Sequence, residues 1–181
     1  MNYGKQENQR VKRQIINAFF ELLAEKSRSE IRPSDIIKRS GVARTTYYRN
    51  FFNQTDIVEC YLNALRESTI PVADDTLSYE NTLQGFTATL QTIRPEKDRF
   101  LLLYHGGFSQ VLQAFLLDSI FDVAGDMSLA DPAIYRLYFV TGAMYNLLIA
   151  WFERDTRETP QELARIAASY LRNGVLNTKK L

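Results

Sequence analysis

Apolar residues recur along most of the chain at the three- and four-residue spacing that marks one face of a helix. Near the N-terminus Ile15, Phe19 and Leu22 follow this spacing, which predicts a helix over residues 6–26. Similar patterns predict further helices over residues 33–40, 44–51, 53–68, 79–93, 96–104, 108–127, 132–154 and 160–173, with a break at Ile70–Asp75 and a frayed tail at Asn177–Leu181. No stretch shows the period of two that is typical of strands, so we expect an all-α fold of about nine helices.

Proline, glycine and capping residues set the ends of the short helices. Pro33 suits a first helical turn, where Asp35 lies beside the positive end of the helix, and Gly41 ends that helix a few residues later. Asn53 is the expected N-cap of the helix that follows, with Asp56 at its third position. The chain therefore has two short helices, 33–40 and 44–51, joined by a tight glycine turn.

Composition excludes several classes of protein. The single cysteine, Cys60, and the single histidine, His105, allow no internal disulfide and no usual metal site, and no cofactor is indicated. The first ten residues contain no apolar secretory signal, and the apolar run Leu137–Phe152 is shorter than the about 18 residues that suggest a membrane span. No nucleophile, base and orienting group occur in a recognisable order. We expect a cytoplasmic protein that is not an enzyme.

Charge is distributed unevenly along the chain. Residues 1–53 contain eleven Lys and Arg against five Asp and Glu, a net charge of +6, whereas the remainder has eleven against sixteen, a net charge of −5. A basic segment joined to an acidic remainder is typical of a protein that meets a polyanion at one end. Solvated helix faces carry such charges too, so this feature alone does not identify nucleic acid.

The two short helices form the pattern of a helix-turn-helix, whose second helix enters the major groove of DNA. If Tyr47 and Phe51 face inward, Arg44 with Tyr48 and Thr45 with Arg49 lie on outward stripes at i, i+4 spacing. These residue types suit DNA, because a guanidinium pairs with guanine O6 and N7, threonine reaches base edges, and tyrosine donates to phosphate. We therefore expect sequence-specific binding of double-stranded DNA.

The segment Ser40-Gly41-Val42-Ala43-Arg44-Thr45-Thr46-Tyr47-Tyr48-Arg49-Asn50-Phe51 resembles the signature of TetR-type bacterial transcriptional regulators. The resemblance extends over about residues 10–62, and the order Phe139–Ala143, Ala150-Trp151, Pro160–Ala164 resembles the last helix pair of one C-terminal subgroup. It implies a three-helix DNA-binding domain at 1–53, a helical regulatory and dimerisation domain at 54–181, and a homodimer on a pseudo-palindromic operator.

This resemblance also implies the DNA contacts, which are expected at Arg32, Ser34, Arg44, Thr45, Thr46, Tyr48, Arg49 and Gln54. The chain departs from the family pattern at three of its positions. Gln54 stands where a phosphate-binding lysine is usual, Arg32 stands where a threonine cap is common, and Ala43 replaces a serine. A neutral amide still hydrogen-bonds to phosphate but releases no counterion.

Small residues among large apolar ones in the last two helices allow close helix approach and predict the dimer interface; tight packing within one chain is the alternative. The small residues are Gly142, Ala143, Ala150, Ala164, Ala167 and Ala168, and the larger Leu171 is expected in the same interface. Aromatic density and the Gly106-Gly107 break predict a site for a small apolar or aromatic ligand, although ordinary core packing also explains such residues. The candidates are Tyr104, His105, Phe108, Tyr145 and Trp151.

Two interpretations of the function stay open. The first is a ligand-responsive homodimeric repressor, in which the helix from residue 54 carries the ligand signal to the DNA-binding segment. The second is a regulator or coactivator whose acidic C-terminal region binds a partner protein in place of a small molecule. A cavity with polar groups among the C-terminal helices would separate the two, and a thermal-shift screen of small molecules would help to do so.

Overall fold

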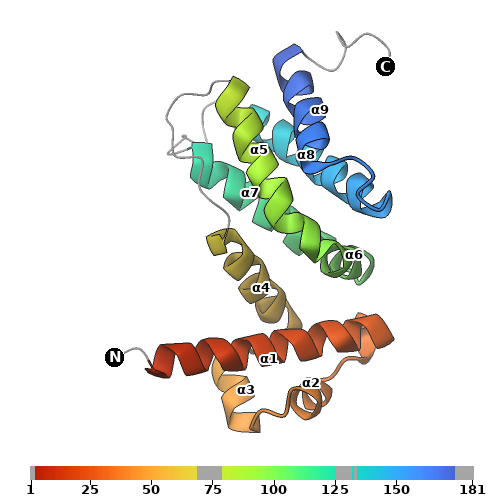
Figure 1. The fold of residues 1–181 in the computed structure, drawn as a ribbon. Helices are drawn as coiled ribbons and strands as arrows, with labels where there is room; N and C mark the ends of the chain where they lie inside the picture. The colour runs from red at the N-terminus through yellow and green to blue at the C-terminus, as the bar shows by residue number, and fades with distance from the viewer. Residues whose placement is uncertain (1–2, 69–78, 125–131, 133, 174–181) are drawn as a thin grey trace. The chain divides into compact units, whose positions relative to one another are not determined.

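A computed structural model describes residues 3–68, 79–124, 132 and 134–173. Within these ranges the side chains of residues 3, 68, 79–82, 120–124 and 171–173 are not described. Every regular element in these ranges is helical, which confirms the all-α prediction (Figure 1). The chain divides into two compact units. One contains residues 1–64 and 102–112, and the other contains residues 65–101 and 113–181. We call the first the head and the second the body.

The helices lie where the apolar periodicity predicts them. They are α1 (Tyr3–Glu25), α2 (Pro33–Ser40), α3 (Arg44–Asn50), α4 (Gln54–Ser68), α5 (Tyr79–Ile93), α6 (Lys97–His105), α7 (Ser109–Ala124), α8 (Ile134–Glu153) and α9 (Pro160–Asn173). Two 3-10 turns, Arg28–Glu30 and Arg94–Glu96, were not expected. The expected break at Ile70–Asp75, the expected end of α7 at Met127 and the expected tail at Asn177–Leu181 lie outside the described residues. None of the described helices is long and apolar enough to cross a membrane.

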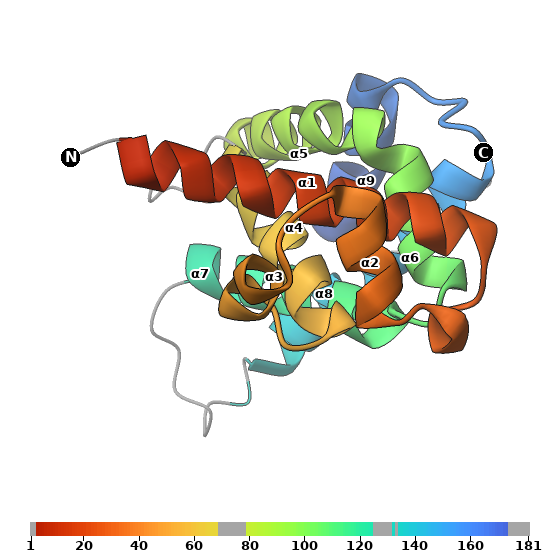
Figure 2. The same ribbon diagram turned by 90° about the horizontal axis from the view of Figure 1, so that it is seen from below.

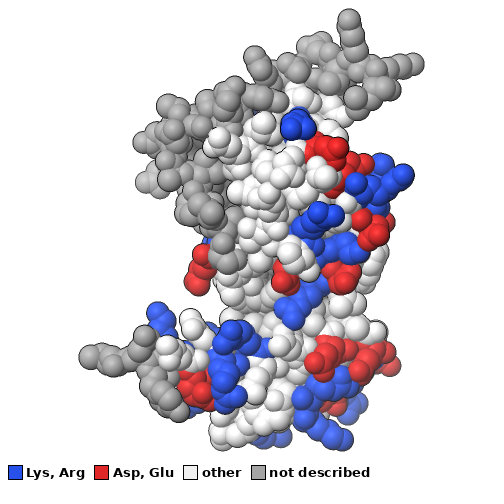
Figure 3. All heavy atoms as spheres, in the orientation of Figure 1, with Lys and Arg blue, Asp and Glu red and all other residues white. Residues whose placement is uncertain are grey.

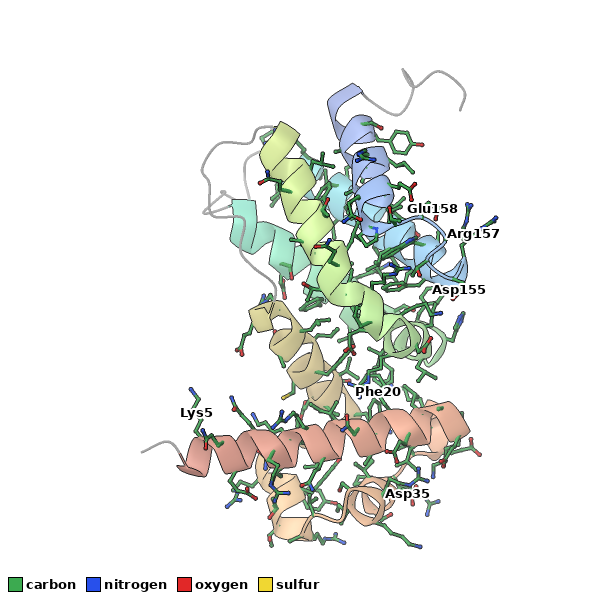
Figure 4. The ribbon with its side chains drawn as sticks, in the orientation of Figure 1. Lys5, Phe20, Asp35, Asp155, Arg157 and Glu158 are labelled. Atoms are coloured by element: carbon green, nitrogen blue, oxygen red, sulfur yellow. The ribbon has the colours of Figure 1, made fainter. Side chains whose placement is uncertain are left out.

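The head is built around the apolar face of α1. Helices α2 and α3 lie on the same side of α1 (Figures 1 and 2). The ring of Phe20, which Figure 4 labels on α1, meets that of Tyr61 of α4 edge-on with centroids 4.9 Å apart. Burying each large apolar side chain contributes about 1.5–3 kcal/mol. The side chains without measurable exposure in this core are Ile15, Phe19, Ile36, Tyr47, Ile57, Val58, Leu103 and Phe108.

The α2–α3 connection is held by local hydrogen bonds. Gly41 ends α2 in the left-handed conformation, with φ 69°, and its N–H donates to the carbonyl of Ile37 at 3.1 Å. At the other end of α2, Asp35 accepts from Lys26 Nζ at 2.7 Å and from the backbone N–H of Arg32 at 3.1 Å. The bond from Lys26, and then that from Arg32, lowers the pKa of the Asp35 carboxyl. These bonds fix the direction in which α2 enters the head.

The turn between α6 and α7 packs against α1. Phe108 meets Phe19 edge-on with ring centroids 5.8 Å apart. Arg28 Nη1 donates to the carbonyl oxygen of Gly107 at 2.7 Å, and the Arg28 guanidinium carbon lies 4.0 Å from the centroid of the Phe108 ring. A Cβ at Gly106 would lie 2.6 Å from the carbonyl oxygen of Leu102 and 3.1 Å from a methyl group of Leu23. Residues 102–112 therefore complete the core of the head.

The body buries one face of α8 and one face of α9, while α5 and α9 pack side by side. The indole Nε1 of Trp151 donates to the carbonyl oxygen of Glu158 at 2.9 Å, which joins the end of α8 to the loop before α9. Trp151 and Phe152 stack, and Phe152 also meets Phe100 with centroids 5.5 Å apart. The opposite face of α8 exposes large apolar side chains, above all Tyr135 at 74% and Phe139 at 69%.

Replacing Gly106 by alanine should destabilise the head, because the new methyl group would overlap the Leu102 carbonyl and press on Leu23. Overpacking of this kind costs about 1–3 kcal/mol of the free energy of unfolding, which urea denaturation measures. Gly4→Ala is the matched control, since a Cβ there meets nothing within 4 Å. It should leave stability unchanged or raise it by up to about 1 kcal/mol. Equal effects of both substitutions would contradict this account of the turn.

Candidate nucleic-acid interface

Helix α3 has one buried and one exposed face. Tyr47 is fully buried and Phe51, directly after the helix, is 2% exposed, so both anchor the helix to the core. The expected contact residues Arg44, Thr45, Tyr48 and Arg49 are exposed, and Thr46 is half-buried. The inward position of Tyr47 and Phe51 is the one that the helix-turn-helix interpretation requires.

Both ends of α3 are fixed by hydrogen bonds. Ala43, the N-cap, has no capping side chain, but its carbonyl oxygen accepts from the Tyr47 N–H at 3.0 Å. At the other end, Asp56 Oδ2 accepts from the backbone N–H of Phe52 at 2.8 Å and from that of Asn53 at 3.3 Å. Asn53 Oδ1 in turn accepts from the Asp56 N–H at 3.1 Å, so Asn53 and Asp56 cap α4 as predicted.

The exposed side chains of α3 contact one another. The guanidinium carbon of Arg44 lies 5.4 Å from the centroid of the Tyr48 ring. The Tyr48 ring meets that of Tyr47 at 90°, with centroids 5.2 Å apart. Burial raises the pKa of the Tyr47 hydroxyl.

The cations of the head fall into two groups. Three are paired with carboxylates: Arg10 with Glu7, Lys26 with Asp35, and Arg39 with Glu21 and Glu25. The bonds from Arg39 lower the pKa of the Glu25 carboxyl. No ion pair joins Arg32, Lys38, Arg44 or Arg49 to a carboxylate in the described ranges, and these four lie on or beside α2 and α3. In Figure 3 Lys and Arg side chains lie along the lower edge of the head and also over α1, with Asp and Glu side chains among them. Lys5, Lys12 and Arg13 of α1 likewise form no ion pair with a described carboxylate, so positive charge open to a polyanion lies on α1 as well as on α2 and α3.

The side chain of Gln54, an expected phosphate contact, forms its hydrogen bonds within the head. Its Nε2 donates inward, to the carbonyl oxygens of Arg28 at 3.1 Å and Ile31 at 2.8 Å, and its Oε1 is buried with no partner among the described residues. In this conformation the amide joins the start of α4 to the turn after α1. Arg32 and Ser34, the other expected contacts outside α3, are exposed.

The head has an open groove beside the end of α3, which sequence reasoning missed. It is lined by residues of the 27–33 turn, by Tyr47 and the 52–55 loop, and by the 105–107 turn. Phe52, 81% exposed, lies on its wall. Arg28 lies there too, and nothing in the local sequence pattern distinguishes it, because its hydrogen-bond partner Gly107 is 79 residues away.

The expected ligand residues fall in different units. Tyr104, His105 and Phe108 belong to the head, where Phe108 is fully buried and His105 is exposed. Tyr145 and Trp151 are buried in the body. Within the described ranges no three His, Cys, Asp or Glu side chains are grouped so that they could hold a metal ion.

The expected dimer residues divide between the surface and the core. Gly142, Ala143 and Ala150 are exposed on α8. Ala164, Ala167 and Ala168 are at most 4% exposed and pack inside the body. The Leu171 side chain lies outside the described residues. The small residues of α9 thus serve the packing of one chain, whereas those of α8 are open to a second surface.

A known protein family matches the C-terminal part of the chain. Residues 80–173, more than half of the chain, match the TetR family described as "Transcriptional regulator C-terminal region". A search of curated proteins gave no match. The match covers α5 to α9, and the resemblance in residues 40–51 points to the same family independently. The chain belongs to the TetR family of transcriptional regulators.

Proposed function

We propose that the protein is a homodimeric repressor that binds a specific sequence of double-stranded DNA through α3. The observation that carries this proposal is the exposed face of α3, where Arg44, Thr45, Tyr48 and Arg49 stand on a base of buried aromatic rings. Direct reading of nucleobases needs side chains that are held close to the floor of the groove. The buried aromatic anchors of α3 hold its exposed side chains in place in this way.

The four side chains divide between base reading and backbone contact. A guanidinium forms two parallel hydrogen bonds with guanine O6 and N7, which makes Arg44, at the start of the helix, suitable for base reading. Thr45 offers a hydroxyl and a methyl group to base edges, and the Tyr48 hydroxyl can donate to a phosphate. Arg32, directly before α2, and Lys38, on α2, add charge for the flanking phosphates.

The homodimer rests on the exposed face of α8. Tyr135, Tyr138 and Phe139 are exposed there together with Gly142 and Ala143. A contiguous apolar patch of this kind is typical of an interface. A two-fold axis through such an interface would repeat the recognition helix on the DNA at about 34–36 Å, one helical turn, and the operator would be pseudo-palindromic.

Control by a small apolar or aromatic ligand is the third part of the proposal. The α6–α7 turn belongs to the head, so a ligand that moves α6 or α7 would act on Arg28 and Phe108 directly. Arg28 is joined through its carbonyl oxygen to Gln54, at the start of α4 and close to the end of α3. A partner protein bound to the body could act on the same turn, and it replaces the ligand if broad compound screening leaves operator binding unchanged.

The first prediction concerns Arg44. Replacing it by alanine should cost about 1–3 kcal/mol of binding free energy and relax the base preference at one position of each half-site. The measurement is selection from random duplexes followed by competition binding. Arg39→Ala is the matched control, since it removes the same charge from the head but from a guanidinium held by Glu21 and Glu25. A wild-type protein without any sequence preference would refute the proposal.

The second prediction concerns the α8 face. Phe139→Glu should place a charge in the interface and convert the dimer into a monomer at micromolar concentration, as measured by light scattering. Gln161→Glu, which adds the same charge at an exposed position of α9, should leave the dimer intact. A wild-type monomer that binds DNA with full specificity would contradict the dimer.

The third prediction concerns the Arg28 contact. DNA binding should slow hydrogen exchange at the Gly106 and Phe108 amides, which donate to the carbonyl oxygens of Leu102 and Leu103. Arg28→Ala should reduce this effect while leaving base preference unchanged, because Arg28 joins the turn to the head without belonging to α3. Identical exchange changes in wild type and variant would show that the signal does not pass through Arg28.

A further inference from the structure

Arg44, Tyr48 and Tyr47 form a stack that runs from the core of the head to its surface. Tyr47 is fully buried, Tyr48 meets it edge-on, and the Arg44 guanidinium lies over the face of Tyr48. Tyr48 is 39% exposed, so its ring is partly desolvated by the protein. The outermost member of the stack is the side chain best suited to read a base.

The buried ring restricts the outer one. Tyr47 cannot rotate freely inside a packed core, and edge-to-face contact with it favours one orientation of the Tyr48 ring. The face of that ring is electron-rich and attracts a cation placed over it. Tyr48 therefore limits the positions that the long Arg44 side chain samples before DNA is bound.

This contact does not compete with base reading. The guanidinium is planar with its N–H donors in that plane, and at 5.4 Å between the guanidinium carbon and the ring centroid these donors can still reach a partner other than the ring. No carboxylate of the described residues forms an ion pair with Arg44. Its donors are thus available for two parallel bonds to guanine while the ring supports the group from one side.

Arg49 provides a comparison within the same helix. It is exposed like Arg44, but no aromatic ring of the described residues lies under its guanidinium. Nothing restricts Arg49 in the same way, which suits a phosphate contact more than the reading of one base. The stack therefore distinguishes two arginines that the sequence presents alike.

We propose that Tyr48 is a positioning residue for Arg44, and that the pair selects a guanine at one position of each half-site. This inference rests on the proposed function of α3 in DNA binding. Tyr48 would then affect specificity through its ring, separately from any bond that its hydroxyl makes to a phosphate.

The test measures base preference at each operator position by selection from random duplexes, followed by competition between duplexes that differ at the Arg44 position. The variants are Arg44→Ala, Tyr48→Leu, which removes the ring, Tyr48→Phe, which removes only the hydroxyl, and the double variant Arg44→Ala/Tyr48→Leu. Arg49→Ala is the control for an unstacked arginine. Thermal unfolding shows whether each variant is folded, and Tyr48→Met replaces Tyr48→Leu if the latter is not.

At the position where Arg44→Ala abolishes the preference for guanine, Tyr48→Leu should lower that preference by about two- to fivefold. This is the factor that corresponds to the free energy of an exposed cation–π contact. Tyr48→Phe should keep the preference for guanine and weaken binding to all sequences alike. The double variant should show no further loss of preference, because the two residues act as one unit. Arg49→Ala should leave this position unchanged.

Two results would overturn the inference while leaving the proposed function intact: full guanine preference in Tyr48→Leu, or loss of preference at a position different from that of Arg44→Ala. Absence of any base preference in the wild-type protein would instead overturn the proposed function itself. A preference for a base other than guanine at the Arg44 position would remove the guanine assignment.

Discussion

The anchoring of α3 by Tyr47 and Phe51 determines which side chains the head presents. A helix of seven residues is too short to be stable alone, so its orientation comes from tertiary contacts. Tyr47 is fully buried and Phe51 nearly so, and their positions leave Arg44, Tyr48 and Arg49 outside. Asp56 accepts hydrogen bonds from two backbone N–H groups directly after α3, which fixes the point where the chain leaves the helix.

Local signals were sufficient to predict the helices. The bounds of α2, α5 and α9 agree with the apolar periodicity, and the proline, glycine and asparagine residues that set the helix ends act through their own backbone and nearest neighbours. The exposed face of α3 could be predicted for the same reason, because one buried tyrosine fixes the direction of every other side chain on a short helix.

Contacts between distant parts of the chain could not be predicted in this way. Arg28 looked like any other arginine of a solvated turn, yet its partners Gly107 and Phe108 are far along the sequence. Gln54 occupies a position where the family pattern suggests a phosphate contact, but the carbonyl groups of the 28–31 turn take its donors. The alanines of α9 suited a dimer interface and tight packing equally well, and burial in the body shows that they serve packing.

The contribution of residues 102–112 to the head affects how the protein folds during synthesis. The helices α1 to α3 leave the ribosome early, but Phe108, which closes the core beside Phe19, is made later. Until then the apolar surface around Phe19 and Leu23 stays open to solvent or to chaperones. The head would therefore reach its final stability only after the start of α7 has been translated, and a fragment that stops at residue 64 would lack part of its own core.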